Sequence, residues 1–383
     1  MKKEVDIVIV GAGASGLMLG ALLEKKSVMI LDNNSKIGSK ILVSGGGKCN
    51  ITNKKLTAKN FLGEQRFIGN VLKRFDQYAL LAWLDKQGLE PIVRKNYQYF
   101  CPNSAKELVD ILEKENSSYN IVRNIVVSRV EKEGEKFSIY TDKGVIQSNK
   151  LIVASGGLSF PKIGATGIGY EIAKSFGHEV STLSAGLVGF TVQPEQFFFK
   201  SLSGIATEVI ITIDKKVIKG SLLFTHKGIS GPAVLDASLY WNRGKIEIDF
   251  LPTINVASLK SSKKNISRSL GLPSRVAKTF LEVLTIKDKA CNLLDISEWE
   301  KILMLKSYSF APAGTFGYSK AEVTKGGVKV EEVDASRMMS KRVKDLYFLG
   351  EVLDVTGELG GYNFQWAFSS AYVCATYLNK EEK

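Results

Sequence analysis

The chain has 383 residues, of which 44% are hydrophobic and 24% are charged, so its composition is that of a globular protein and excludes a mainly disordered one. Lys and Arg number 52 against 39 Asp and Glu, which gives a formal net charge of +13. This excess fits either a lysine-rich solvated surface or a polyanionic partner such as RNA, and charge alone does not separate the two.

The cysteines and histidines argue against a metal centre. The four cysteines lie far apart and form no C-x-x-C pair, so we expect neither zinc nor a dithiol site. Two histidines, His178 and His226, are too few for a histidine-based metal site. Four reduced thiols in a chain of this length favour a cytoplasmic location. The apolar N-terminus contains Asp6 and several glycines, which favours a folded segment over a signal peptide, and no other run of ~18 apolar residues predicts a membrane span.

The N-terminal residues form a dinucleotide-binding pattern. The apolar run Val5–Val10 predicts a buried parallel strand, and residues 11–16 (Gly-Ala-Gly-Ala-Ser-Gly) follow it at the start of an expected helix. A second predicted strand, Val28–Leu31, ends at Asp32. A G-x-G-x-x-G turn between two such strands, with an acid ~20 residues on, is typical of a βαβ unit that binds a dinucleotide.

Each residue type in this pattern has a physical purpose. Gly11 makes the tight turn, Gly13 lets backbone amides approach a pyrophosphate, and Gly16 lets the helix pack closely on the strand. The helix N-terminus adds unpaired N–H groups and a positive partial charge. Asp32 can accept hydrogen bonds from both hydroxyls of the adenosine ribose and would repel a 2′-phosphate.

Three later features indicate FAD as the dinucleotide. Residues 121–150 have the pattern of a β-meander, and residues 150–157 continue as a buried strand that ends in glycines. Near the C-terminus, the apolar residues 346–349 precede Gly350, Glu351 and Asp354. This order is typical of flavoproteins with two dinucleotide-binding domains. Because only one G-x-G-x-x-G unit is present, we expect NAD(P)H to bind transiently as the electron donor.

Four blocks of sequence resemble those of the BaiN/RdsA family of FAD-dependent oxidoreductases, also called YhiN-like or aminoacetone-oxidase-like flavoproteins. These blocks occupy residues 38–53, 156–170, 223–233 and 324–365, and they keep the family's order over most of the chain. Lys40 and Lys48 depart from the pattern, because many relatives carry arginine at both positions.

The resemblance implies an α/β fold with a Rossmann-like FAD-binding domain of the two-dinucleotide-binding-domain type. This domain would consist of residues 1–186 and 337–383. A β-barrel-like insert at residues 187–336 would interrupt it and carry a helical subdomain. The sequence agrees, because the insert begins with alternating strand patterns and becomes helical and basic at about residues 256–306.

The residues that we expect to bind FAD come from the motifs and from the resemblance. We assign the amides at the start of the last predicted helix to the pyrimidine edge of the isoalloxazine ring, since a positive helix end stabilises reduced flavin. The complete set is Gly11, Gly13, Ala14, Ser15, Gly16, Asp32, Asn33, Lys40, Gly45, Gly46, Gly47, Asn50, Val127, Ala154, Ser155, Gly156, Gly350, Glu351, Asp354, Gly360, Gly361, Asn363 and Phe364.

Two residues are candidates for proton transfer beside the flavin. Cys49 follows the glycine loop at residues 45–47 and could act as a general acid, or it could be a small buried residue in a pyrophosphate loop. His226 stands where the family keeps a histidine and could donate a proton from the substrate side, or it could brace its loop.

Three functions remain open from the sequence. The resemblance favours reduction of a uridine of 23S ribosomal RNA to dihydrouridine, in which a target base leaves its stack to reach the flavin. The segment from Lys260 to Lys289 contains eight Lys and Arg and two acidic residues, Glu282 and Asp288. This excess of positive charge could bind phosphates. Other relatives suggest a small-molecule amine oxidase or an enone or steroid-type reductase. The third possibility is a non-catalytic FAD-containing RNA-binding protein.

Overall fold

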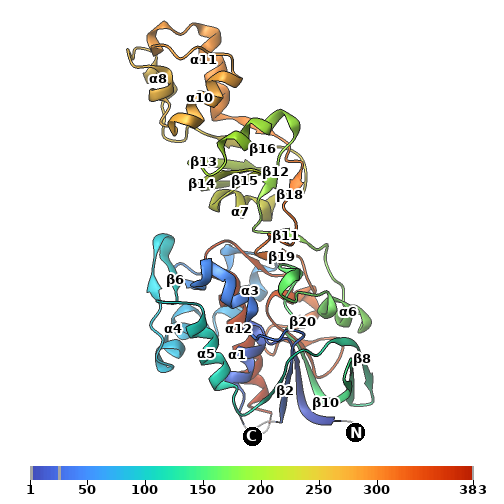
Figure 1. Cartoon of the computed structure of the whole chain (residues 1–383). Helices are drawn as coiled ribbons and strands as arrows, with labels where there is room; N and C mark the ends of the chain where they lie inside the picture. Colours follow the sequence, from blue (N-terminus) through green and yellow to red (C-terminus); the bar gives the residue numbers. More distant parts are fainter. Residues whose placement is uncertain (1–2, 25–26, 382–383) are drawn as a thin grey trace. The chain divides into compact units, whose positions relative to one another are not determined.

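The computed structural model describes residues 3–24 and 27–381 and divides into two compact units. Unit 1 comprises Met1–Ser184 and Val323–Lys383, and unit 2 comprises Ala185–Glu322 (Figure 1). The sequence predicted that the insert ends at residue 336 and that the FAD-binding domain resumes at residue 337. In the structure, residues 323–336 already belong to unit 1. The reason is strand pairing, since β20 (Val333–Asp334) pairs with β21 (Met339–Ser340), which joins the main sheet of unit 1.

A nine-stranded sheet forms the centre of unit 1. Five of its strands run parallel in the order β22-β10-β1-β2-β7, which is the arrangement expected from the N-terminal βαβ pattern. The antiparallel strands β8 and β9 extend from β10, as the meander pattern predicted. The bounds are β1 Lys3–Val10, β2 Val28–Leu31, β7 Asn120–Val122, β8 Val127–Glu133, β9 Lys136–Thr141, β10 Gly144–Val153 and β22 Leu346–Phe348.

The burial of side chains in strand β10 changes along its length. Its first half lies between β9 and β1 and alternates between buried and more exposed residues, as in a strand with only one face covered. Its last three residues, Leu151–Val153, are completely buried, because β1 and β22 flank them in the parallel part of the sheet.

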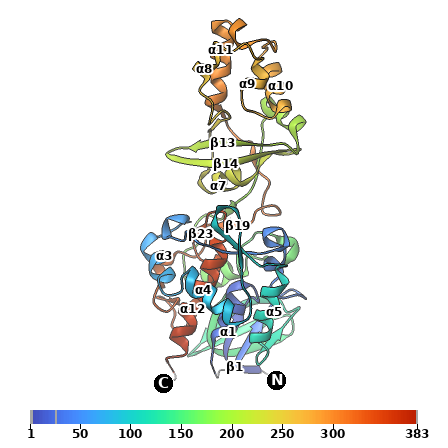
Figure 2. The ribbon, with the colours of Figure 1, turned by 90° about the vertical axis from the view of Figure 1, so that its left-hand side faces the viewer.

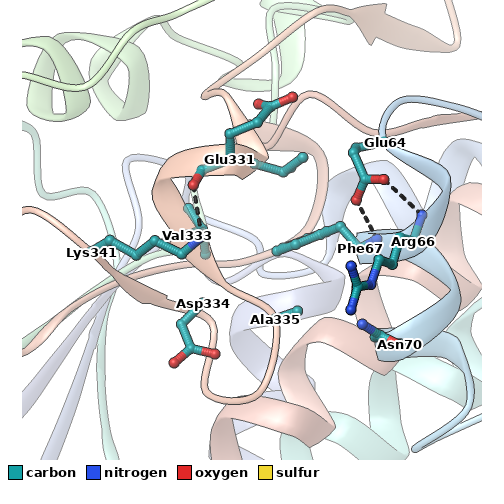
Figure 3. A pocket seen from close by; sticks show the side chains of 10 residues that line it. Glu64, Arg66, Phe67, Asn70, Glu331, Val333, Asp334, Ala335 and Lys341 are labelled. Atoms are coloured by element: carbon teal, nitrogen blue, oxygen red, sulfur yellow. Dashed lines mark hydrogen bonds between the residues drawn. The ribbon is translucent and has the colours of Figure 1, made fainter.

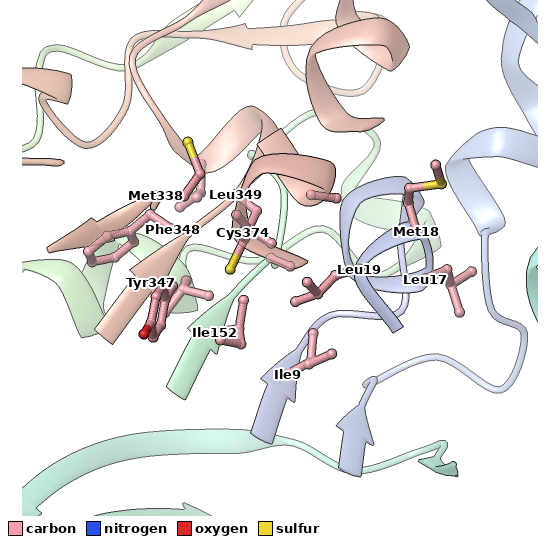
Figure 4. Packing of buried hydrophobic residues seen from close by; sticks show 14 of the residues in the cluster. Ile9, Leu17, Met18, Leu19, Ile152, Met338, Tyr347, Phe348, Leu349 and Cys374 are labelled. Carbon is pink, nitrogen blue, oxygen red and sulfur yellow. The ribbon is translucent and has the colours of Figure 1, made fainter. Parts of the chain in front are cut away.

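Helices pack on this sheet, and the C-terminal helix α12 lies beside α1 (Figure 2). Ile9 of β1, Leu17 and Leu19 of α1, Phe348 of β22 and Cys374 of α12 belong to one fully buried core (Figure 4). The first and last parts of the chain therefore share one hydrophobic interior. The helices of unit 1 are α1 Ala14–Leu22, α2 Ser39–Val43, α3 Gln65–Leu72, α4 Gln77–Lys86, α5 Lys106–Glu115, α6 Ile168–Ser175 and α12 Tyr362–Leu378.

Among the described residues, three smaller sheets accompany the main sheet, and two of them contact α12 through β3 and β23. β3 (Asn50–Asn53) pairs with β6 (Gln98–Phe100), which pairs with β5 (Ile92–Val93). Two further pairs join segments that are distant in sequence: β4 Phe61–Leu62 with β23 Thr356–Gly357, and β11 Ser184–Gly186 with β19 Val323–Lys325.

Unit 2 combines an antiparallel seven-stranded sheet with helices, as the alternating and then helical sequence patterns predicted. Its own buried core contains an aromatic cluster around Phe199, Phe250 and Phe280. The strand order is β17-β16-β13-β14-β15-β12-β18. The bounds are β12 Phe190–Thr191, β13 Ala206–Ile213, β14 Lys216–Thr225, β15 Gly228–Ser230, β16 Ile246–Asp249, β17 Tyr308–Phe310, β18 Gly314–Thr315, α7 Pro232–Tyr240, α8 Val256–Leu259, α9 Ile266–Ser269, α10 Ser274–Val283 and α11 Ile296–Leu303.

Candidate cofactor and active site

The three glycines of the N-terminal motif meet different surroundings. Gly11 has φ +110°, and a Cβ on it would lie 2.5 Å from the carbonyl oxygen of Ala154. A Cβ on Gly16 would lie 1.9 Å from the carbonyl oxygen of Gly11, so Gly16 allows the helix to approach the turn. A Cβ on Gly13 would meet no described atom within 4 Å. The first and third glycines therefore allow close packing, and the second borders open space.

Helix α1 begins directly at this open space. Ala14 is its first residue and Ser15 its second, and in the described structure no side chain caps its N-terminus. A helix end with uncapped amides binds anions, because its N–H groups and its dipole both favour negative charge. The uncapped start of α1 is therefore compatible with the predicted binding of a pyrophosphate, which stays a prediction.

Asp32 is held at the end of β2 by two backbone amides. Its Oδ2 accepts from the Ala12 N–H at 2.6 Å, and its Oδ1 accepts from the Asn34 N–H at 2.8 Å. Each carboxylate oxygen has a further lone pair for a ribose hydroxyl. The neighbouring Asn33 donates its Nδ2 to the carbonyl oxygen of Gly164, so its side chain braces another loop. Val127 begins β8 and is buried.

The second predicted cofactor segment reaches the same motif. Gly350 has φ +69°, and a Cβ on it would lie 2.8 Å from Ser15 Oγ in the first turn of α1. Its N–H donates to Ser370 Oγ at 3.0 Å, and its carbonyl oxygen accepts from Trp366 Nε1 at 3.1 Å. The glycine that follows β22 is thus fixed between α1 and α12.

Glu351 and Lys40, both expected to bind FAD, bind each other. Lys40 Nζ donates to Glu351 Oε2 at 2.6 Å and to Ser159 Oγ at 2.7 Å. The other carboxylate oxygen of Glu351 accepts from the Thr324 N–H at 2.7 Å. This network joins four segments of unit 1. Neither Ser159 nor Thr324 was a predicted site residue, although both lie inside the sequence blocks that carried the resemblance.

The glycine loop before β3 has an unusual backbone. Gly45, Gly46 and Gly47 have φ values of +55°, +67° and +82°, and Cys49 also has a positive φ of +42°. A Cβ on Gly46 would meet no described atom within 4 Å, so this loop, too, borders open space. Glycine adopts left-handed conformations without steric strain and lets the backbone approach a ligand closely.

The residues that follow this glycine loop contact the N-terminus of α12. A Cβ on Gly361, the residue before this helix, would lie 2.7 Å from both Asn50 Oδ1 and the carbonyl oxygen of Thr52. Asn53 Nδ2 donates to the carbonyl oxygen of Gly360 at 3.1 Å. The structure thus brings together two segments that were both expected to bind FAD.

Three expected site residues make contacts within the protein, and their role at the cofactor stays a prediction. Asn363 uses both side-chain polar atoms on the backbone of Gly357, so it braces the turn before α12. Phe364 stacks on Phe368 of the same helix. Burial raises the pKa of Asp354, and a hydrogen bond with Ser181 partly opposes this shift.

The two candidate acids lie in different units and in different environments. Cys49 is fully buried in unit 1, where burial and a hydrogen bond with Cys101 raise the pKa of its thiol well above the usual value. The same bond lowers the pKa of Cys101. Cys49 is therefore a protonated thiol at neutral pH. His226 lies in unit 2, exposed in the two-residue turn between β14 and β15.

Two buried polar atoms support a cofactor in unit 1. Ser155 Oγ, directly after β10, and Asn50 Oδ1, beside the start of α12, have no hydrogen-bond partner among the described residues. Gly156 has φ +72° and also borders open space. FAD offers hydroxyl and N–H donors and phosphate acceptors, which are the groups that these atoms and the uncapped α1 lack. The residues present therefore fit this cofactor.

A separate pocket of about 420 Å³ lies between α3 and residues 330–341 (Figure 3). Glu64 accepts from the first backbone amides of α3, and Lys341 Nζ donates to the carbonyl oxygen of Glu331 at 2.8 Å. None of the predicted cofactor or catalytic residues lines it. It is distinct from the surroundings of α1 and the N-terminus of α12.

Comparison with known proteins identifies the family. The model of the HI0933-like protein Rossmann domain matches residues 5–377. The chain belongs to this family. The HI0933-like chain is 40% identical over 401 residues to the ribosomal RNA dihydrouridine synthase of Haemophilus influenzae, with 100% of both chains covered. It is 37% identical over 391 residues to the Escherichia coli protein of the same name, covering 97% of this chain and 98% of that one.

A third relative has a different substrate in its name. The 3-dehydro-bile acid delta(4,6)-reductase of Clostridium scindens is 29% identical over 400 residues, with 95% of this chain and 97% of that one covered. Among solved structures, a quinol-fumarate reductase matches with a TM-score of 0.55 and 14% identity, over 99% of this chain and 71% of that chain. This match shows the fold alone. The predicted family, the Rossmann-type α/β fold and the class of oxidoreductase are confirmed.

The structure describes residues 3–24 and 27–381, and the following two statements hold for these residues. Among them, no three His, Cys, Asp or Glu side chains gather in a way that could hold a metal ion. No helix within the same residues has the length and apolar character needed to cross a membrane.

Proposed function

We propose that this HI0933-like chain is a FAD-dependent oxidoreductase that reduces a uridine of 23S ribosomal RNA to dihydrouridine. The observation that carries the proposal is its full-length similarity to two relatives named ribosomal RNA dihydrouridine synthase. The cofactor surroundings support it, because four distant segments of unit 1 converge on the N-termini of α1 and α12.

Each end of FAD has candidate partners in unit 1. Asp32 would hold the adenosine ribose, and the first amides of α1 would hold the pyrophosphate. The N-terminus of α12, together with Asn50 Oδ1, would face the pyrimidine edge of the isoalloxazine ring. There the positive helix end would stabilise the negative charge of the reduced ring.

Reduction of the uracil C5–C6 double bond needs a hydride and a proton. Bound FAD would supply the two-electron chemistry. The proton for C5 must come from a group that is protonated at neutral pH and reaches the base. Cys49 meets the first condition, because burial keeps its thiol protonated. His226 remains the alternative from unit 2.

Several finer points belong to the same proposal. NAD(P)H is the proposed electron donor, and it would bind transiently because the sequence carries a single G-x-G-x-x-G unit. The cytoplasm is the proposed location, which the four unpaired thiols support. We propose that the domain boundaries follow residues 184 and 322, where the compact units meet in sequence, in place of the boundaries expected at residues 186 and 337.

A small-molecule reductase is the second candidate. The bile acid relative supports it, since an enone is reduced by the same kind of hydride transfer as uracil. The confirmed oxidoreductase class excludes the third possibility, a non-catalytic RNA-binding protein. RNA binding, and loss of uridine on addition of a reductant, separate the first candidate from the second.

Dihydrouridine mapping of 23S ribosomal RNA tests the proposal. RNA from a strain that lacks the gene should lose a dihydrouridine, and the wild-type gene should restore it. Gly13→Ala should fail to restore it, because the new methyl group would occupy the space assigned to the pyrophosphate. Gly314→Ala in unit 2 is a matched control, because its Cβ would make only an ordinary contact with Thr191. An unchanged map in the deletion strain would contradict the proposed substrate.

A further inference from the structure

The small sheet β3-β6-β5 carries a concentration of positive charge that the cofactor site does not use. We call residues 48–60 and 92–100, which contain these strands and their flanking turns, the cationic platform. The platform contains no Asp or Glu. Its cations are Lys48, Lys54, Lys55, Lys59, Arg94 and Lys95.

An exposed aromatic ring lies among these charges. Tyr97 has 48% of its surface exposed, and Lys55 Nζ lies 4.0 Å from the centre of its ring. In the same hairpin, the Arg94 guanidinium lies 5.1 Å from the centre of the Phe100 ring. Exposed aromatic rings next to Lys and Arg are the means by which proteins bind single-stranded nucleic acids, since bases stack on the rings and phosphates contact the cations.

The backbone presents Tyr97 in a strained conformation. Asn96 and Tyr97 have φ values of +60° and +63°, so two consecutive non-glycine residues are left-handed. Such strain persists only where neighbouring contacts hold it, and it is frequent in ligand-binding segments. Here the Tyr97 carbonyl oxygen accepts from the Lys54 N–H at 2.9 Å.

Direct hydrogen bonds connect the platform with the N-terminus of α12. One side chain, Asn53, donates its Nδ2 both to the Asn96 carbonyl oxygen at 3.2 Å and to the Gly360 carbonyl oxygen at 3.1 Å. Tyr362, the first residue of α12, donates its hydroxyl to the Lys55 carbonyl oxygen at 3.2 Å. The exposed ring is therefore fixed relative to the helix end that we assign to the flavin.

We propose that the cationic platform binds single-stranded RNA beside the nucleotide that is reduced. Tyr97 stacks on a base next to the target, and Lys54, Lys55 and Arg94 contact the flanking phosphates. This inference rests on the proposed function and adds the surface that holds the RNA. A target base that leaves its stack exposes the face of its neighbour, and an aromatic ring held near the flavin replaces the lost stacking.

RNA binding by the full-length, FAD-loaded protein tests the role of the ring. The probe is a single-stranded 23S ribosomal RNA fragment with a fluorescent label, and its affinity is measured by anisotropy. Tyr97→Ala should weaken binding about 5- to 150-fold, as expected for the loss of one stacked base. Tyr97→Phe should bind like the wild type, because the ring remains. FAD absorbance shows that each variant is folded around its cofactor.

A matched aromatic residue controls for non-specific effects. Phe197 in unit 2 is also 48% exposed, and Lys200 Nζ lies 3.4 Å from the centre of its ring. Its substitution Phe197→Ala should leave the affinity unchanged, because Phe197 belongs to unit 2 and lies outside the cationic platform. Equal losses in Phe197→Ala and Tyr97→Ala would overturn the proposal.

The phosphate contacts have their own measurement. Changing Lys54, Lys55 and Arg94 together to Gln should reduce the slope of log affinity against log salt concentration by about two, since each contact to a single strand contributes about 0.7. An unchanged slope, together with normal binding by Tyr97→Ala, would contradict RNA binding by the platform. Dihydrouridine formation by the wild type would in that case still support the proposed function. If the wild type bound no RNA and formed no dihydrouridine, both proposals would fail.

Discussion

The two cationic regions of the chain, the platform in unit 1 and residues 260–289 in unit 2, differ in what surrounds their charges. The platform has no acidic residue, and its hairpin carries an exposed Tyr97. In the segment of unit 2, Lys289 Nζ pairs with Glu298 at 2.8 Å, and Arg275 donates to the carbonyl oxygen of Ser201. Positive charge in unit 2 is therefore partly used for its own fold.

This difference shows why charge density is a weak guide to an RNA site. Helix α10 buries Val276, Ala277 and Phe280 and turns its other side to solvent, where Lys and Arg are ordinary surface residues. The platform adds two independent features, an exposed ring and hydrogen bonds to the start of α12. The following substitutions test which unit binds the cofactor, which unit binds the RNA and which unit donates the proton.

The largest effect is expected from the two candidate acids, one in each unit. Cys49→Ala and His226→Ala should keep FAD, and loss of a proton donor should slow substrate reduction about 10²- to 10⁴-fold. Stopped-flow measurement should show normal flavin reduction by the donor and slow reoxidation by substrate. Lys227→Ala, in the same turn as His226, is the control. Full turnover in both acid variants would move the proton donor elsewhere, with Tyr362 as the next candidate.

A smaller effect is expected at the ribose site of unit 1. Asp32→Ala should weaken FAD by about 1–3 kcal/mol, because the ribose hydroxyls lose a charged acceptor while the amide contacts remain. Fluorescence titration of the apoprotein with FAD measures the change. Asp32→Asn retains an oxygen for the Ala12 N–H and should lose less. Wild-type affinity in Asp32→Ala would refute the role of this carboxylate.

The basic segment of unit 2 provides the direct counterpart of the platform test. Neutralising Lys263, Lys264 and Arg268 together should flatten the salt dependence of RNA binding by about two to three ion equivalents if these cations contact phosphates. Flavin content should stay the same. An unchanged slope would show that these three residues of unit 2 do not contact the RNA phosphates. The platform would then be the remaining candidate for these contacts.

The smallest effect concerns His178, the buried histidine of unit 1. Burial lowers its pKa from the usual 6.5, although the neighbouring Glu332 opposes the shift. Because the unfolded chain binds this proton more readily, the stability that neutral His178 contributes is present above pH 6.5 and is lost as pH falls through the lowered pKa. His178→Gln should flatten the decrease in melting temperature between pH 7.5 and pH 5 by roughly a few degrees. His226→Gln, at an exposed position, should not; equal curves for wild type and His178→Gln would contradict the prediction.

Local patterns carried most of the predicted fold. The βαβ turn at residues 5–32 and the meander at residues 121–150 were predictable, because strand alternation and glycine spacing are properties of neighbouring residues. The helix after Gly361 was predictable for the same reason. These patterns also located the two helix N-termini around which the candidate site is built.

Pairings between distant segments were not predictable in the same way. Lys40 and Glu351 were both expected to bind FAD, but the sequence did not show that they pair across 311 positions. Asn363 was expected at the cofactor, although its amide closes a local turn with Gly357. The left-handed backbone at Asn96 and Tyr97 also lacked a sequence signal, since tertiary hydrogen bonds stabilise it.

The position of β22 beside β10 has a consequence for synthesis on the ribosome. Unit 2 is complete in sequence once residue 322 has been made, whereas unit 1 at that moment lacks β22 and α12. The nascent chain would then expose the edge of β10 and the side of α1 that α12 covers, both of which favour association with other chains. The discontinuous architecture therefore delays the completion of the unit 1 core until the C-terminal helix has been synthesised.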